Sequence, residues 1–548
     1  MKSNEEFKAL VLEKARTLEL QNKKRNRIIT TTVCSFLVCV VAFSAFAGNG
    51  GSGGFFSDGA LIVDNSEAVS YQPDAVESKE ESFESNVDSN PSNDTSSQID
   101  ESANSDSSVN EEPNVSDEPD VSDEPDVSDD PEIDYDPDID ENPDSILYIY
   151  DVPESGAVLD LMVNFAPKSE SDKNALDDIG TRNGIADFSF ELFKKAYIGG
   201  ENYVISPTSA LYALGMISNG ARGETKKEFQ RVLSKTSTTR LNKYLKEYSK
   251  LFGEGKGYKT NISNSIWIGD LIAPREDFLQ TNADYYNAGV FKTELPSEHA
   301  LNEINGWVEN KTNGLINNFI QEIPEDTVEI LVNTVYFEAK WTKMKLNVIK
   351  NQTFTNANGR LVTVDKISDN ADGYFENDDC TGIRLNYEGD YSFIALLPKK
   401  DKALDEFIND FDATDYFALS ENETFSSRNE FEIKFRMPRF EAESDLQLDS
   451  ALKEMGLVTA FDPSLADLTG LGKSIAGDNL YISKVMQKAK ISLDEFGTVA
   501  AASSGIFETP ESESNKIKLV DFNKPFVYFI VDDTTNLPIF IGTVESVG

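Results

Sequence analysis

The sequence predicts an α+β domain with large, mostly antiparallel β-sheets, preceded by one transmembrane helix and a disordered acidic stalk. From residue 183 onward, segments with helical spacing come first and runs rich in Val, Ile, Phe and Tyr follow, an order typical of an α+β domain. Residues 28–47 form an apolar run without a charge. Residues 80–167 contain 28 Asp or Glu but no Lys or Arg.

The composition excludes several functional classes. The stretch 80–167 carries more than half of the formal net charge of −46, and this acidic balance argues against nucleic-acid binding, which needs Lys and Arg against the phosphates. Cys380 is the only cysteine outside residues 28–47, so no disulfide within the domain is expected. His299 is the only histidine, which removes almost all Ser-His and Cys-His nucleophile pairs and most zinc sites. We therefore expect a solvated His299, no metal, no cofactor and no enzyme activity.

The first 182 residues divide into four segments. Residues 1–27 end in the basic cluster KKRNR and are expected to stay cytoplasmic. The apolar run 28–47 is long enough to cross the hydrocarbon core of a membrane. Residues 48–145 include the near-repeat NVSDEP, DVSDEP, DVSDDP and are too polar to form a core, so we expect a disordered stalk. Residues 146–182 are a transition segment, and its apolar part, 146–165, is a candidate extra strand of unknown register.

Two interpretations of residues 28–47 stay open. We favour an uncleaved anchor, a single-pass helix in the cell membrane that leaves the domain extracellular. The alternative is a signal peptide cleaved after Ala47, because Ala45-Phe46-Ala47 is a small-x-small site. Both interpretations export the domain, and the second makes it a secreted protein.

The globular domain is expected over residues 183–548. Apolar residues recur at helical spacing in three segments, residues 184–197, 209–223 and 302–314. Later runs have the composition of β-strands: 329–341, 391–400, 431–444, 484–497, 524–533 and 538–547. The close spacing of the last runs favours hairpins and antiparallel sheets.

Residues 222–259 hold 11 Lys or Arg against 4 Asp or Glu, the only basic concentration in the exported region. A solvated helical face is the simpler interpretation. The alternative is a surface on which the acidic stalk or an external polyanion docks. The sequence leaves both open.

The segment DEFGTVAAASSGIFETPESESNK, residues 494–516, is made mostly of small and polar residues yet continues a strand-like run. A surface loop is the plain interpretation. The other is a strand that must slide between two paired strands, because alternate side chains of a strand face one side. Until the apolar Ile506, that side would carry only small residues: Thr498, Ala500, Ala502 and Ser504.

Several separated motifs, in order, make residues 183–548 resemble the serpin family. They are VISPTSALYALGMISNGARGET, INGWVENKTNGLI, LVNTVYFEAKW, FEIKFRMPRFEAESDLQLDSALKEMGL, DEFGTVAAASSG, FNKPFVYFI and PIFIGTV. The resemblance implies a serpin-like fold with about eight or nine helices and an exposed reactive loop. It also implies a monomeric suicide inhibitor of extracellular serine proteases, with cysteine proteases as an open alternative. In serpins the target cleaves the loop and becomes acylated, and the freed arm inserts into the main sheet.

The resemblance also assigns roles to residues of the loop hinge. Glu495 matches the acidic residue with which this hinge commonly starts, and Gly497 supplies a backbone pivot. The further hinge residues are Thr498, Ala500, Ala501 and Ala502. No Pro and no charge lies between Gly497 and Ile506, which predicts a hinge that can insert.

A second set of residues is expected where the main sheet opens. Ser206 and Asn333 match polar residues that line this region in serpins, and Trp341 matches the tryptophan near the point where the loop first enters. Gln487 stands where many serpins have a histidine. Because an amide both donates and accepts hydrogen bonds, the network around it could persist.

The position of the reactive bond has two interpretations. Counting from Glu495 by the usual family spacing places the bond between Glu511 and Ser512. Counting back from the motif FNKPF points about three residues later, near Glu513 and Ser514. An acidic residue before the bond suggests a target with a basic specificity pocket, such as a glutamyl endopeptidase, whereas cleavage near Phe507 by a protease with an apolar pocket stays open.

We therefore expect a membrane-tethered or secreted protease inhibitor whose stalk holds the domain away from the cell surface. Two rival functions are a non-inhibitory serpin, cut as a substrate without trapping a protease, and a surface protein that serves only for binding or display.

Overall fold

The computed structural model describes Leu147 and residues 157–325, 327–343, 345–400, 402–425, 431–498 and 516–548. They belong to one compact unit, Asp129–Gly548. The predicted cytoplasmic segment, membrane span and acidic stalk lie outside the described residues, as do loop residues 499–515. None of the helices described is long and apolar enough to cross a membrane.

The described residues contain nine α-helices, so the expected number is confirmed. Three of them, α2, α3 and α7, coincide with the segments predicted from helical spacing. At the start of α3, the Ser206 side chain accepts a hydrogen bond from the backbone of Ser209 and Pro207 takes the first helical position, two features that favour a helix start. The helices are α2 (Ile179–Ala196), α3 (Pro207–Ser218), α4 (Gly223–Leu233), α5 (Thr238–Tyr248), α6 (Glu276–Tyr286), α7 (Glu298–Lys311), α8 (Leu404–Asp410), α9 (Ala413–Glu421) and α10 (Asp449–Glu454).

The largest sheet, called the main sheet below, has eight strands. In spatial order these are β1 (Leu159–Asp160), β6 (Gly289–Thr293), β4 (Tyr258–Gly269), β7 (Glu329–Lys340), β18 (Gly497–Thr498), β17 (Met486–Leu493) and β15 (Phe440–Gln447), with β3 (Glu254–Gly255) paired to β4. All neighbouring strands are antiparallel except β4 and β6. Because β18 is antiparallel to both of its neighbours, β7 and β17 run in the same direction on either side of it.

Three smaller sheets complete the domain. The second sheet contains β13 (Thr424–Phe425), β10 (Gly373–Glu376), β11 (Cys380–Asn386), β12 (Tyr391–Pro398), β20 (Phe526–Asp532), β21 (Pro538–Val544) and β2 (Tyr203–Ile205). The third contains β19 (Lys516–Asp521), β14 (Phe431–Pro438), β9 (Leu361–Asn370) and β8 (Asn347–Thr355), and the smallest pairs β16 (Gly472–Ser474) with β5 (Ile272–Pro274). Among the strands of the described residues, only β14 and β19 add a further parallel pair, so the expectation of mostly antiparallel sheets is confirmed.

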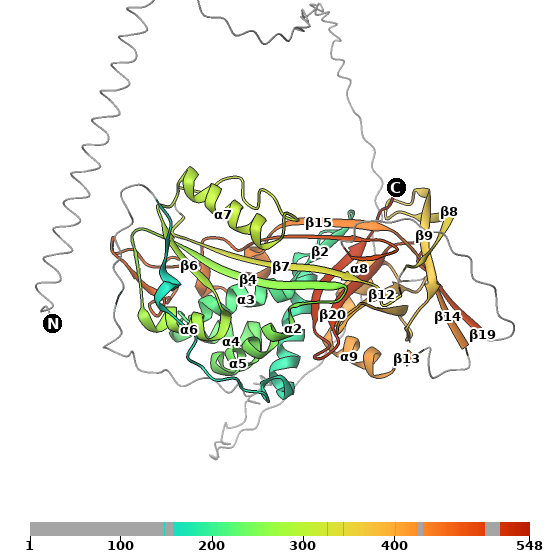
Figure 1. Cartoon of the computed structure of the whole chain (residues 1–548), viewed down its shortest axis with the longest axis horizontal. Coiled ribbons are helices and arrows are strands. Elements are labelled where there is room, and N and C mark those ends of the chain that lie inside the picture. Colours follow the sequence, from blue (N-terminus) through green and yellow to red (C-terminus); the bar gives the residue numbers. More distant parts are fainter. Residues whose placement is uncertain are drawn as a thin grey trace, which may run out of the picture. The chain divides into compact units, whose positions relative to one another are not determined.

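The main sheet is covered on both faces (Figure 1). Helix α7 lies on one face, and α2 to α6 lie on the other. Alternate side chains of β7 reach the two cores: Val332 packs with Ile304 and Val308 of α7, whereas Leu331 joins the larger core that includes α2 and α3. All side chains of α3 are buried, because this helix is enclosed between the main sheet and the second sheet.

The apolar part of the transition segment does add a strand to the main sheet. Strand β1 pairs with β6, with Leu159 opposite Lys292. Further upstream, Leu147 forms an isolated bridge with Arg275. The expectation of an extra strand is therefore confirmed, and its register is now defined.

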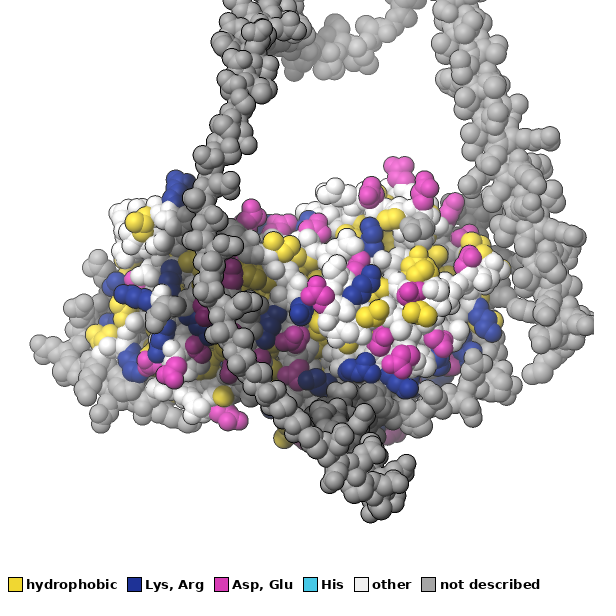
Figure 2. All heavy atoms as spheres, turned by 180° about the vertical axis from the view of Figure 1, so that it is seen from behind, with side chains coloured by type: hydrophobic (Ala, Val, Ile, Leu, Met, Phe, Trp, Pro, Cys, Tyr) yellow, Lys and Arg dark blue, Asp and Glu magenta, His cyan; other side chains and the backbone are white. Residues whose placement is uncertain are grey.

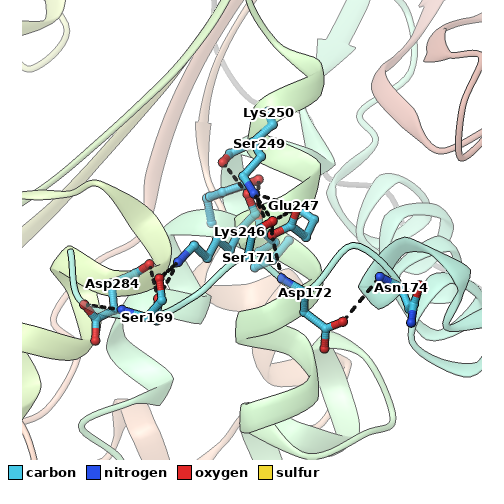
Figure 3. A network of polar contacts seen from close by, with 11 residues as sticks. Ser169, Ser171, Asp172, Asn174, Lys246, Glu247, Ser249, Lys250 and Asp284 are labelled. Carbon is cyan, nitrogen blue, oxygen red and sulfur yellow. Dashed lines mark hydrogen bonds and ion pairs between the residues drawn. The ribbon is translucent and has the colours of Figure 1, made fainter.

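The rest of the transition segment runs along α5 and α6 (Figure 3). The Lys246 ammonium donates to the Ser169 carbonyl over 2.6 Å, and Lys250 donates to the Ser171 hydroxyl over 2.8 Å. The Glu247 carboxylate accepts from Ser171 over 2.9 Å. Burial raises the pKa of Glu247, but hydrogen bonds from Lys250 and Ser171 outweigh it and hold that pKa below its ordinary value. This contact therefore weakens as the pH falls through that pKa.

Some Lys and Arg side chains of the basic concentration at 222–259 have acidic partners nearby. Arg240 forms an ion pair with Asp178 at 2.8 Å, and Lys243 lies 4.0 Å from Asp172. On the face seen in Figure 2, Lys and Arg side chains are interspersed with Asp and Glu. Docking of the acidic stalk on this region involves residues outside those described and stays a prediction.

Candidate functional site

The position between strands β7 and β17 in the main sheet is called the slot below. The loop hinge already occupies one end of this slot. Gly497 lies opposite Lys340 and Thr498 opposite Ala339 on β7, while Thr498 also lies opposite Leu493 on β17. Among the described residues, β7 and β17 have no other ladder partner on the sides that face each other. The predicted arm therefore begins as a short central strand of the main sheet.

A tight turn leads from β17 into β18. The Asp494 carboxylate accepts hydrogen bonds from the backbone N–H groups of Phe496, at 2.7 Å, and Gly497, at 3.3 Å. The indole N–H of Trp341 donates to the Asp494 carbonyl over 3.0 Å. Gly497 has a φ of 149°, and a Cβ there would lie 2.1 Å from the Ala339 carbonyl oxygen. Only glycine fits, because any side chain would meet backbone atoms.

Thr498 is fully buried beneath this turn. Its hydroxyl lies 2.6 Å from the hydroxyl of Tyr387, whose ring stacks on Trp341 with the centroids 4.4 Å apart. Burial raises the pKa of Tyr387 well above its ordinary value, so the phenol stays neutral. The Thr498 side chain is thus enclosed beside the neutral Tyr387 hydroxyl, and a charged group at this position would lose its hydration.

Glu495 anchors the outer side of the same turn. Its carboxylate forms an ion pair with Arg439 at 2.8 Å, and its backbone carbonyl accepts from the N–H of Leu346 over 2.8 Å. Arg439 separates β14 from β15, so the segment 431–444, predicted as one strand-like run, is in fact two strands in different sheets. The preceding Pro438 has no N–H to continue a ladder.

Replacing Glu495 with lysine should loosen the hinge. The new ammonium would face Arg439 and turn an attraction into a repulsion. Because the Arg439 side chain is 43% exposed, solvent screens the pair, and we expect a loss of about 1–2 kcal/mol in the free energy of unfolding. Denaturant titration measures the change. Glu441→Lys, at an exposed position of the adjacent β15, is the matched control and should change little; equal losses in both variants would contradict a role for the Glu495 ion pair.

Two of the sheet-opening residues, Ser206 and Gln487, bind each other. The Ser206 N–H donates to the Gln487 side-chain oxygen over 2.9 Å, and the Gln487 amide donates to the Ser206 carbonyl over 2.8 Å. The Ser206 hydroxyl donates to the Ile539 carbonyl on β21. The amide thus uses both its donor and its acceptor to tie β17 to the start of α3.

Asn333 belongs to a neighbouring buried network. Its side chain accepts from the Ser209 hydroxyl and donates to Asn264. The N–H of Ser209 donates to the Ser206 hydroxyl over 3.2 Å, so Ser209 joins the two networks. Trp341 lies apart from them, at the hinge end of the slot.

The remaining predicted site residues lie outside the described residues. These are Ala500, Ala501, Ala502 and both candidate reactive bonds, Glu511–Ser512 and Glu513–Ser514. Their roles stay predictions. Sequence reasoning missed Tyr387, Arg439, Asn264 and Ser209, although Ser209 lies within the quoted motif VISPTSALY. His299 is exposed at the start of α7, as expected, and no metal-binding cluster occurs in the described part of the chain.

Fold and site together define a domain whose main sheet holds Gly497 and Thr498 as a short central strand between β7 and β17. The serpin (serine protease inhibitor) family model matches residues 183–547. A serpin-like protein of Thermococcus kodakarensis is 30% identical over 377 residues, which cover 66% of this chain and 85% of that protein.

Solved structures agree with this match. The native state of tengpin, a thermophilic serpin, has 36% identity and a TM-score of 0.66 and covers 71% of this chain and 100% of that chain. The latent state of tengpin has 33% identity and a TM-score of 0.59, covering 70% and 100%. This chain belongs to the serpin family. Membership supports protease inhibition, rather than catalysis, as its general function.

Proposed function

We propose that this chain is an irreversible suicide inhibitor of extracellular serine proteases, with cysteine proteases as a second target class. The target's nucleophile attacks the carbonyl carbon of the reactive bond, Glu511–Ser512 or Glu513–Ser514. The peptide C–N bond breaks, the amine of the following serine leaves with a proton, and the arm stays attached to the protease as an acyl group. Insertion of the arm into the slot then distorts the protease before water can hydrolyse that bond.

One observation carries this proposal: the hinge is already paired with both strands that border the slot. In an antiparallel register, each further residue of the arm moves one residue back along β7 and β17. Counting on from Thr498 brings residue 504 opposite both Asn333 and Gln487. The arm's small side chains would therefore pass over the sheet-opening networks, where a bulky or charged side chain would not fit.

Chain length supports cleavage as the trigger. Seventeen residues, 499–515, connect Thr498 to Lys516 on β19. Ten of these residues, roughly 33 Å of extended chain, are needed to reach the level of Glu329 at the start of β7. The other seven residues span at most about 25 Å, and they would have to lead the chain back to β19. Strand β19 lies past the Lys340 end of β7 (Figure 1). An intact loop is therefore too short to fill the slot while β19 stays paired, and a cut loop is not.

Residues 28–47 are proposed to hold the domain on the outer face of the cell membrane as a single-pass anchor; cleavage after Ala47 would make it a secreted protein. The length of the uncharged run and the flanking KKRNR cluster support the anchor. Fractionating cells that express the full chain tests this point. Recovery of the chain from the medium, starting at Gly48, would contradict the anchor.

The trapping mechanism is tested by incubating the full chain with a panel of serine and cysteine proteases that includes a glutamyl endopeptidase. We expect an SDS-stable complex with at least one member and a mass-spectrometric cut at one of the two candidate bonds. Cleavage without a complex would instead identify a non-inhibitory serpin. A loop cut that leaves binding to other molecules unchanged, again without a complex, would favour a display protein.

A further inference from the structure

A small cavity lies beside the start of β7. It is bordered by the segment that follows α7, by the first residues of β7 and by the residues that lead into β17. The space inside it is about 30 Å³, which is enough for one or two water molecules but not for another side chain. Its lining is mainly apolar and includes Ile320, Ile323, Thr327, Glu329, Ser483 and Met486.

Two polar side chains of this lining have no partner among the described residues. Glu329 is 3% exposed, and neither of its carboxyl oxygens forms a hydrogen bond with the described part of the chain, nor does the Ser483 hydroxyl. An ionised carboxylate at such a place would lose its hydration without compensation, so the neutral acid is the form that fits the site. Accordingly, burial raises the pKa of Glu329 from its ordinary value of 4.5 to about 8.

Among the described residues, no nearby charge favours the ionised form of Glu329. Burial is the only cause of its shifted pKa. Lys484, the cation of the cavity lining, is exposed, and the Asp449 carboxylate already accepts from the N–H of Val485 over 2.7 Å. The titratable groups of the surrounding elements are Glu322 and Glu325 after α7, Asp270 after β4, Tyr481 and Lys484 before β17, and Asp449 at the start of α10.

The chain that covers the cavity is anchored on either side of it. Asn305 of α7 accepts from the N–H of Ile320 and donates to the Ile320 carbonyl, both over 2.9 Å. At the other side, the Val328 carbonyl accepts from the N–H of Gly269 over 2.8 Å. The described residues between these anchors, 321–325 and 327, form no hydrogen bond with another element. Apolar packing around the cavity therefore holds this stretch in place.

We propose that Glu329 is a proton-controlled latch at this end of the main sheet. While its carboxyl is protonated, the stretch 321–327 stays closed over the cavity; loss of the proton opens the stretch, so that water reaches the carboxylate. In the closed state the neutral carboxyl and the Ser483 hydroxyl can each donate and accept, directly or through a water molecule, for which the space is sufficient. Opening uncovers the start of β7. This regulation goes beyond the proposed function and does not depend on it.

The direction of the pH dependence follows from the pKa of Glu329 in the two states. In the open state the carboxyl is hydrated and ionises near its ordinary pKa of 4.5, whereas in the closed state it ionises near pH 8. The closed state thus binds the proton more tightly, and closure is fully favoured below about pH 4.5. As the pH rises from there toward about 8, closure weakens by up to about tenfold per unit. Above about pH 8 both states are ionised and no further loss occurs.

The first test is denaturant titration of the full chain from about pH 5 to about pH 9. Glu329→Gln keeps the shape of the side chain but cannot ionise. Relative to this variant, the unfolding equilibrium constant of the unchanged chain should rise by up to about tenfold per pH unit until about pH 8 and then level off. Glu322→Gln, which alters an exposed acid of the same lining, should behave like the unchanged chain. A difference between the unchanged chain and Glu329→Gln that is the same at every pH would overturn the proposal.

The second test needs no variant, so it remains decisive if Glu329→Gln fails to fold. It follows hydrogen exchange at the N–H groups of Gly269 and Ile320, the two donors at the anchors, with each rate divided by the intrinsic rate at the same pH. We expect protection at both to fall by up to about tenfold per unit toward about pH 8. We also expect both to be less protected than the N–H groups of β20, because the latch opens without global unfolding. Protection that is independent of pH, or equal to that of β20, would refute the latch.

Discussion

Replacing Thr498 with arginine should abolish protease trapping while leaving the loop open to cleavage. Thr498 is the first arm residue buried in the slot, and its hydroxyl lies 2.6 Å from that of Tyr387. A guanidinium at this buried point would lose its hydration, which costs several kcal/mol. Since about 1.4 kcal/mol is a factor of ten, the yield of SDS-stable complex should fall by at least about a hundredfold.

Thr498→Ser is the matched control for this prediction. It keeps the hydroxyl that meets Tyr387 and removes only a methyl group, so trapping should persist. Both variants are compared by the amount of inhibitor consumed per protease molecule trapped. If the arginine variant trapped as efficiently as the serine variant, entry of Thr498 into the sheet could not be part of the mechanism.

Replacing Gly497 with valine should expel the hinge from the slot. A Cβ at this position would lie 2.1 Å from the Ala339 carbonyl oxygen, and the φ of 149° disfavours any side chain. Both the clash and the backbone strain vanish only if β18 separates from β7. We expect the free energy of unfolding to fall by about 2–4 kcal/mol, and we expect most of the inhibitor to be cut as a substrate.

Gly253→Val tests whether this effect is local to the hinge. An added Cβ at Gly253 meets nothing within 4 Å, so stability and trapping should change little. Denaturant titration and gel analysis of the complex measure the two properties. Retention of normal stability and trapping by Gly497→Val would contradict the pairing of β18 with β7.

Three helices and several long strands could be predicted from the sequence, but the neighbours within the main sheet could not. Helix α3 is marked by a start signal and a glycine after its end, and β7 by a long run of strand-forming residues. The two-residue strand β18 is too short for any periodicity to indicate it. Its neighbour β7 lies more than 150 residues earlier in the chain, and local pattern carries no information about such a pairing.

The candidate site likewise contains residues that could be predicted from the sequence and residues that could not. Glu495, Gly497 and Thr498 are predicted as hinge residues from small side chains, a pivot glycine and family resemblance, and the structure places them in the turn after β17 and in strand β18. Tyr387 could not be predicted, because its contact with Thr498 spans 111 residues and the local sequence NYEGDY indicates only a turn. Glutamate usually lies on the protein surface, and only the folded structure shows that Glu329 is buried.

The most direct test of the account is the stability of the full chain before and after one cut in the loop. In the intact chain the described residues between β7 and β17 are Gly497 and Thr498 of β18, and the proposed function requires the rest of the arm to enter the sheet there after the loop is cut. We predict that the cut chain unfolds at a higher temperature and a higher denaturant concentration than the intact chain, because the freed arm pairs with β7 and β17. A cut chain that unfolds at the same point as the intact chain, or earlier, would contradict insertion and with it the proposed inhibition.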